Sequence, residues 1–242
     1  ALDKQKRRLG LFGIGLKLAS IAHAENLHVI SMKKSSPAVG RAWTDEGLKR
    51  GFYCLLLSPK DLTQVTHLSS LPRASRQGTW VLWQKLFRFS SQFDRSAELC
   101  DKLLRSLRDY LGLHLHRFLG RVSITIDVVD EKKGAGAPRT VESFDPFGYG
   151  KSSHDDYPAA FEPAGEYAQT MSIKAHIWPS NSQSKNYMLP GGAVRRQGFY
   201  FYRNDRLLSG GGWHGIKDGL DTHDSLGRVE VHLNIDVERE AS

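Results

Sequence analysis

The sequence predicts an α+β protein built in two parts. In the first part, helix-like and strand-like stretches alternate, which is typical of helices packed on an open sheet, an α/β sandwich. In the second part, short strand-like runs dominate and indicate a smaller, β-rich domain. Between them, the stretch 149–165 contains serines and prolines and indicates a linker. We therefore predict two domains, 1–148 and 149–242.

Apolar periodicity predicts the elements of the first part. Small and apolar residues between 16 and 26 suit a helix packed closely on a sheet. Runs rich in β-branched, aromatic and other apolar residues are typical of strands. Four such runs occur, at 28–32, 51–57, 78–83 and 122–128. We expect 51–57 to be the more buried of the first two, because it is apolar almost throughout.

A longer helix is predicted to begin at Ser96, a good N-cap, with Glu98 in its first turn. Leucines then recur every fourth residue, which places them in one apolar stripe. These leucines are Leu99, Leu103, Leu107 and Leu111. By contrast, 33–40 indicates a turn, and 58–77 indicates irregular chain because it has two prolines and many serines.

Three strand-like stretches predict the second part, at 170–178, 198–208 and 227–237. The middle stretch is interrupted by Arg203-Asn204-Asp205-Arg206, a turn-forming sequence, so it should form the two strands of a hairpin. Residues 132–139 are rich in glycine, alanine and proline and indicate a hairpin loop or an exposed insertion.

Composition narrows the class of protein. The chain has 34 Lys and Arg against 26 Asp and Glu, a net charge of +8, which favours polyanions such as nucleotides or nucleic acid. No apolar run approaches the ~20 residues of a membrane-spanning helix. The two cysteines, Cys54 and Cys100, indicate buried thiols in a reducing compartment. We therefore expect a cytoplasmic protein without a membrane partner.

The glycine motif at 10–15 is the most informative feature, and it leads directly into the predicted helix. Closely spaced glycines let backbone N–H groups approach a ligand. The helix that follows would direct its free N–H groups and its positive dipole end to the same place. The motif therefore predicts a phosphate-binding turn. A tight turn that serves only helix packing is the alternative that the residues leave open.

With these motifs in place, the chain resembles the GHKL (Bergerat-fold) ATPase superfamily of gyrase B, MutL proteins, ninety-kilodalton heat-shock chaperones, histidine kinases and MORC proteins. In particular, it is similar to stand-alone prokaryotic or MORC-like GHKL ATP-binding proteins. The segments that carry the likeness are 10–17, the strand ending in Ser31, Gly78-Thr79, 111–119, 144–147, 197–208 and 211–213. The resemblance implies the C-terminal part of a GHKL α/β sandwich followed by a partial transducer-like β-rich domain.

The resemblance also implies that the chain binds ATP. Glycine backbone amides would bind the β- and γ-phosphates, two apolar residues would pack the turn, and a lysine on the helix would lie near phosphate. A threonine after glycine supports the adenine-binding aspartate in these folds, although an ordinary strand threonine is the alternative. The candidate cofactor-binding residues are therefore Gly10, Leu11, Phe12, Gly13, Ile14, Gly15, Lys17 and Thr79. Leu11 stands where relatives often carry Lys or Arg.

Catalytic residues are not expected in this chain. In the superfamily, the catalytic glutamate and the magnesium-binding asparagine precede the lid, and no acidic residue here stands in a matching context. We therefore predict no catalytic residue and no metal ligand, with Mg²⁺ held from outside the chain, so the chain alone should be inactive. In the intact protein, ATP hydrolysis would drive a conformational switch and homodimerisation. Lys185 could replace the transducer lysine, or be a surface lysine.

Other residue patterns have plainer interpretations. The principal alternative function is a non-enzymatic, basic nucleic-acid-binding module in which the glycine turn is only structural; a degenerate, inactive remnant of the ATPase is a third. His114 and His116 have no third metal ligand nearby in sequence, so we interpret them as helix-end or packing residues. His154-Asp155-Asp156 could form a metal or acid/base cluster, but its place in a Ser/Pro-rich stretch indicates a solvated loop. The aromatic residues near 80–89 are predicted to pack in the core instead of stacking on bases.

Overall fold

The computed structural model describes residues 14–51, 53–68, 77–87, 96–130, 134–165 and 170–234. The chain divides into two compact units, one formed by 12–99 and the other mainly by 100–242. Both contain helices and sheets, which confirms the α+β class at a coarse level. The division falls inside α4 (Ser96–His114). The domain bounds 1–148 and 149–242 stay a prediction.

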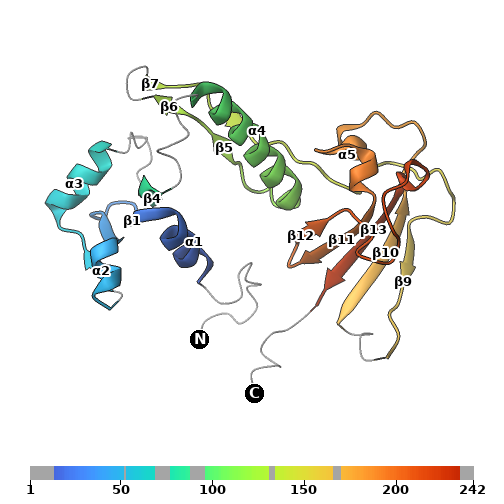
Figure 1. The fold of residues 1–242 in the computed structure, drawn as a ribbon, viewed down its shortest axis with the longest axis horizontal. Coiled ribbons are helices and arrows are strands. Elements are labelled where there is room, and N and C mark those ends of the chain that lie inside the picture. Colours follow the sequence, from blue (N-terminus) through green and yellow to red (C-terminus); the bar gives the residue numbers. More distant parts are fainter. Residues whose placement is uncertain are drawn as a thin grey trace. The chain divides into compact units, whose positions relative to one another are not determined.

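The first unit is built on a four-stranded antiparallel sheet in the order β3-β2-β1-β4. Figure 1 labels β1 and β4 of this sheet and the helices α1, α2 and α3 of the unit. Its strands are β1 (Ala24–Met32), β2 (Val39–Thr44), β3 (Leu55–Leu56) and β4 (Gly78–Leu86). Its helices are α1 (Gly15–His23), α2 (Asp45–Lys49) and α3 (Pro59–Leu68). The long central strand β1 pairs with both neighbours, so it organises the unit.

Strand alternation gives this sheet two distinct faces, each with its own helix. On one face, Leu27 lies opposite both Trp83 and Trp43 in the register, and the Trp83 indole N–H donates to Ser20 Oγ of α1 at 2.7 Å. On the other face, a Cβ at Gly40 would lie 2.7 Å from Leu62 Cδ2 of α3. The glycine therefore permits the close approach of α3 to β2.

The second unit is built on a five-stranded sheet in the order β12-β11-β13-β10-β9. Its strands are β9 (Ala159–Phe161), β10 (Met171–Ile177), β11 (Gly198–Arg203), β12 (Arg206–Gly210) and β13 (Gly227–Leu233). β11 and β13 are parallel, whereas the other pairs are antiparallel.

Short elements complete the second unit. They are the paired strands β5 (Thr125–Ile126) and β8 (Arg139–Thr140), the paired strands β6 (Val129–Asp130) and β7 (Gly134–Ala135), helix α5 (Lys185–Met188), and the 3₁₀ turns Ala193–Arg196 and Thr222–Asp224. Pairing of β6 with β7 shows a hairpin at the start of the predicted insertion 132–139.

The core of the second unit lies where its sheet meets the end of α4 and the connection from β10 to β11. One buried cluster comprises Leu113, Leu189, Tyr200, Tyr202 and Leu207, and a second comprises Trp178, Tyr187 and Ala193. Between the two clusters, Arg228 is fully buried. Its guanidinium donates to the backbone carbonyls of Pro146, Asn186 and Tyr187, so this one side chain joins three segments.

Several element predictions are confirmed, and others are corrected. The predicted α1 and α4 helices form, as do β1, β4 and the strands β10 to β13. The region 58–77 is not irregular throughout, because α3 begins at Pro59. Ser58 and Asp61 cap α3 reciprocally, with Ser58 N donating to Asp61 Oδ2 at 2.9 Å and Asp61 N donating to Ser58 Oγ at 3.3 Å. This capping box with proline at the first helical position was the overlooked signal.

Two strand predictions were too long. Of the described residues in 51–57, Leu55–Leu56 form the strand, and both side chains are exposed because β3 is the edge strand. Of 122–128, only Thr125–Ile126 forms a strand. Cys54 is exposed, contrary to the predicted burial, and both cysteines are free thiols.

The first residues of the predicted linker 149–165 are packed against the end of β10. Tyr149 lies 5.1 Å from Trp178 between ring centroids, and its hydroxyl hydrogen-bonds His176 at 2.8 Å. Ser152 and Ser153 donate to the carbonyls of Ile177 and Trp178. Serines that satisfy backbone carbonyls therefore fix the segment to the end of β10.

Candidate nucleotide-binding site

The predicted glycine turn precedes α1 in the sequence. Its residues Gly10, Leu11, Phe12 and Gly13 lie outside the described residues. Ile14 precedes α1 and Gly15 is its first residue, and among the described residues no side chain caps this end. A Cβ added at Gly15 would have no heavy atom within 4 Å. The first N–H groups of α1 are therefore not taken up by a capping side chain, the arrangement in which a helix can bind an anion.

Two contacts of α1 hold it on the sheet. Ser20 donates its hydroxyl hydrogen to the Leu16 carbonyl at 2.7 Å, which leaves its oxygen to accept from Trp83. Lys17 places its ammonium nitrogen 5.2 Å from the centre of the Trp43 ring. An exposed cation–π contact of this kind is worth about 0.5–1 kcal/mol. Lys17 is therefore held near the first turn of α1 by a weak contact that a phosphate could replace.

Thr79 lies on the same face of the sheet as α1. It lies four residues before Trp83 on β4, with Val81 midway between them. Strand alternation therefore directs Thr79, Val81 and Trp83 to one side of the sheet. Thr79 Oγ1 and Ser31 Oγ are 2.8 Å apart, and these two residues are direct partners in the β1–β4 register. The predicted residues Lys17 and Thr79 thus share a face but contact different neighbours.

Part of this face is open and apolar. The side chains Val39, Val81 and Trp83 remain 61%, 46% and 41% exposed, although each belongs to a strand that pairs with β1. Leu27, which lies beneath α1, is by contrast buried. An apolar surface beside two hydroxyls and a helix N-terminus could accept the base of a nucleotide, whose ring packs on apolar surface and whose edge forms hydrogen bonds.

Four described acidic residues of this unit are engaged elsewhere. Glu25, Asp45 and Glu46 form exposed ion pairs with Lys85, Lys49 and Arg50, and Asp61 caps α3. Hydrogen bonds from Ser58 to the Asp61 carboxylate lower its pKa, which suits a permanent cap and not a proton acceptor. Across the described ranges, no cluster of three His, Cys, Asp or Glu side chains is arranged to hold a metal ion.

A buried polar network in the second unit was missed by the sequence interpretation. Glu230 accepts hydrogen bonds from Arg117, from His176 at 3.2 Å and from His232 at 2.9 Å. Burial would raise the pKa of Glu230, but the histidine hydrogen bonds and the Arg117 charge outweigh it and hold the pKa far below its ordinary value. The one local signal was the alternation of polar residues at 228, 230 and 232 within an apolar strand.

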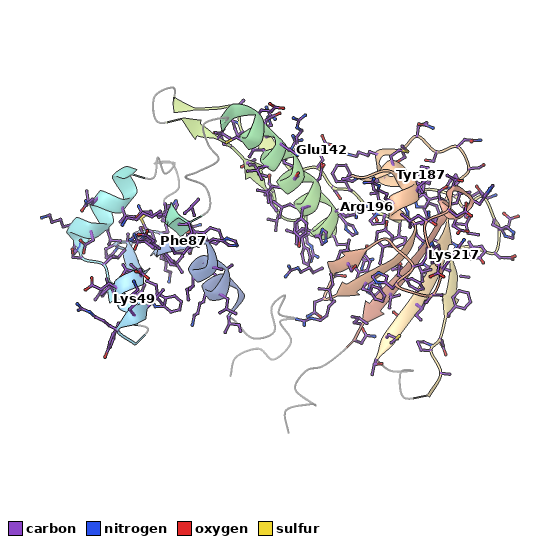
Figure 2. The ribbon with its side chains drawn as sticks, in the orientation of Figure 1. Lys49, Phe87, Glu142, Tyr187, Arg196 and Lys217 are labelled. Carbon is purple, nitrogen blue, oxygen red and sulfur yellow. The ribbon has the colours of Figure 1, made fainter. Side chains whose placement is uncertain are left out.

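The other residues that the sequence analysis singled out lie in a turn and in a surface ion pair. Asn204 and Asp205 both have positive φ, 49° and 65°, and form the two-residue turn between β11 and β12. Lys185 forms an exposed ion pair with Glu142 at 2.9 Å, consistent with the interpretation as a surface lysine. Glu142 is labelled in Figure 2.

The predicted packing roles of the histidines are confirmed. His114 stacks on Tyr110, and its Nδ1 lies 3.0 Å from the Tyr110 carbonyl oxygen at the end of α4. His116 is buried, with Nδ1 2.7 Å from the Leu113 carbonyl oxygen. The triplet 154–156 lies in an exposed loop, as predicted. The aromatic prediction holds only in part, because Trp83 and Phe87 are 41% and 50% exposed.

Comparison with known proteins gave no assignment: no family model and no curated protein matched this chain. Within the described parts of the chain, none of the helices combines the length and apolar character needed to cross a membrane.

Proposed function

We propose that the unit formed by 12–99 is an ATP-binding module of the GHKL type. The observation that carries the proposal is the shared face: the uncapped start of α1, Lys17 and the Thr79–Ser31 hydroxyl pair all lie on one side of one sheet. A nucleotide spans such a face, with its phosphates at the helix N-terminus and its base over the strands.

Each group would then have a distinct role. The backbone amides of the glycine turn and of α1 would stabilise the phosphate charge, and Lys17 would add a positive charge on the same turn. Thr79 and Ser31 would hydrogen-bond the adenine edge directly or through water. Binding without turnover is the activity we expect of this 242-residue chain, because hydrolysis needs a positioned base and a metal in addition to a phosphate cradle.

The experiment compares two lysines that carry the same charge. ATP binding is measured by titration calorimetry for the full chain, for Lys17→Met and for Lys34→Met, which removes an exposed lysine from the turn between β1 and β2. We expect Lys17→Met to weaken ATP binding about tenfold, the effect of one charge-assisted contact, and Lys34→Met to change it by less than about twofold. Thr79→Val should weaken the binding of ATP more than the binding of inorganic triphosphate, because it removes a contact to the base.

Two results would contradict the proposal. One is equal weakening by the two lysine substitutions, which would indicate an effect of net charge alone. The other is DNA binding that falls steeply with salt while ATP does not bind, which would support the basic nucleic-acid-binding module.

A further inference from the structure

A cavity of this unit lies on the face of the sheet that is opposite to α1. It has a volume of about 380 Å³, is open to one side and is lined by residues of β1, β2, β3, β4 and α3. His28 and Ala42 form its floor and are direct partners in the β1–β2 register. Leu55, Leu57 and Val65 form the apolar part of its walls, and Thr44, Gln64 and Gln84 form the polar part. The cavity is therefore separate from the proposed nucleotide face and needs its own explanation.

The walls of this cavity are fixed by specific contacts. The Leu57 N–H donates to the Gly40 carbonyl at 3.1 Å, which continues the pairing of β3 with β2. The Ser58–Asp61 capping box sets the start of α3, and Leu62 packs against Gly40. Because β3 is paired with β2 and α3 is capped, the cavity is preformed. Little binding free energy would therefore be spent on ordering its walls.

His28 gives the cavity its chemical character. The residue is 8% exposed, lines the cavity, and its Nδ1 has no hydrogen-bond partner among the described residues. Burial lowers the pKa of His28, so the imidazole is neutral at pH 7. A neutral imidazole has one nitrogen that donates and one that accepts. An unpartnered buried nitrogen is unfavourable, and a ligand that supplies the missing hydrogen bond relieves the cost.

Charge and size restrict the ligand. The neutral His28 offers no counter-charge, and Asp61 at the rim already accepts hydrogen bonds from Ser58. An anion would therefore be repelled by Asp61 and would find no cation in the pocket floor. The volume and the leucine and valine walls suit an aromatic ring system of one or two rings.

We propose that this cavity is a binding site for a small, uncharged aromatic molecule with one N–H or O–H group that donates to Nδ1 of His28, whose own proton is then on Nε2. The apolar walls hold the ring, and the imidazole selects for the polar group. Selectivity follows because a ring without the donor leaves the buried nitrogen unpaired. The site is independent of ATP, because it opens on the other face of the sheet.

The test uses indole as the probe and benzothiophene as a ring of the same shape without the N–H donor. Binding to the full chain is followed by NMR, through the resonances of the His28 ring. We expect saturable shifts with indole and at least about tenfold weaker binding of benzothiophene. Val65→Phe fills the cavity and should weaken indole at least about tenfold. Leu18→Phe, at an exposed position of α1, is the matched control and should leave indole binding unchanged.

A third variant isolates the hydrogen bond. His28→Leu should bind the two probes with similar affinity, because it keeps the apolar volume and removes the imidazole. Should His28→Leu fail to fold, two other results still test the proposal: the preference of the wild type for indole over benzothiophene, and the weaker binding of indole to Val65→Phe. Unsaturable shifts, equal affinity of the two probes for the wild type, or unchanged indole binding to Val65→Phe would each overturn the proposal.

Discussion

Replacing Arg228 by methionine should unfold the second unit at a markedly lower temperature. The guanidinium is fully buried and donates to the carbonyl oxygens of Pro146 at 2.7 Å, Asn186 at 2.8 Å and Tyr187. It also lies 4.9 Å from the centre of the Trp178 ring. Methionine keeps most of the apolar volume but leaves three carbonyls without these donors, so the substitution isolates the polar role of Arg228.

The magnitude follows from the number of bonds. A hydrogen bond from a charged donor contributes about 1.5–3 kcal/mol, and the contributions within one cluster are not additive. The cost of burying the guanidinium, which lowers the pKa of Arg228, offsets part of the gain. We therefore expect a loss of about 3–5 kcal/mol in the free energy of unfolding. In a domain of this size, such a loss lowers Tm by roughly 6–20 °C.

The assay is thermal unfolding followed by near-ultraviolet circular dichroism, which reports the packing of the buried tryptophan and tyrosines. Arg139→Met is the matched control, because Arg139 is half exposed and pairs with Asp101 at 3.2 Å on the surface. The control should change stability by less than about 1 kcal/mol. Equal melting temperatures of Arg228→Met and Arg139→Met would refute the argument, since they would show that the carbonyls find other partners when Arg228 is absent.

Two further predictions concern the same unit. Glu230→Gln should lower the free energy of unfolding by about 3 kcal/mol at pH 7, because the lowered pKa of Glu230 means that its ionised carboxylate stabilises the fold. This contribution is complete above the ordinary pKa of 4.5 and is lost as the pH falls below it, so the stabilities of the wild type and the variant in urea titrations should converge in acid. A constant difference in stability from pH 7 to pH 3 would contradict the assignment. Gly112→Ala should lower the free energy of unfolding by about 2–3 kcal/mol, because its Cβ would lie 2.7 Å from Phe144 Cδ2 and would clash with backbone. Gly120→Ala has open space around its Cβ and should change stability by less than about 0.5 kcal/mol. Similar urea midpoints for the two variants would show that α4 shifts to make room.

The candidate nucleotide face was predictable in part from the sequence. The glycine motif and the apolar residues after it predict α1, and the position of Thr79 at the start of a strand is a local pattern. The pairing of Thr79 with Ser31 is not local, because these residues are brought together by the register between β1 and β4. The cavity above His28 was not predictable either, since α3 was hidden in a region that serine and proline mark as irregular.

Local chemistry in the sequence determined the hairpin at Asn204–Asp205, the strands around it and the long helix that begins at Ser96, because turn residues, caps and apolar periodicity act over a few neighbouring residues. Tertiary structure alone decided which polar side chains are buried. Arg228 meets carbonyls from Pro146 and Asn186, and Glu230 meets Arg117, across long stretches of chain. A charged residue can be buried only where such partners converge, and that convergence depends on the packed fold.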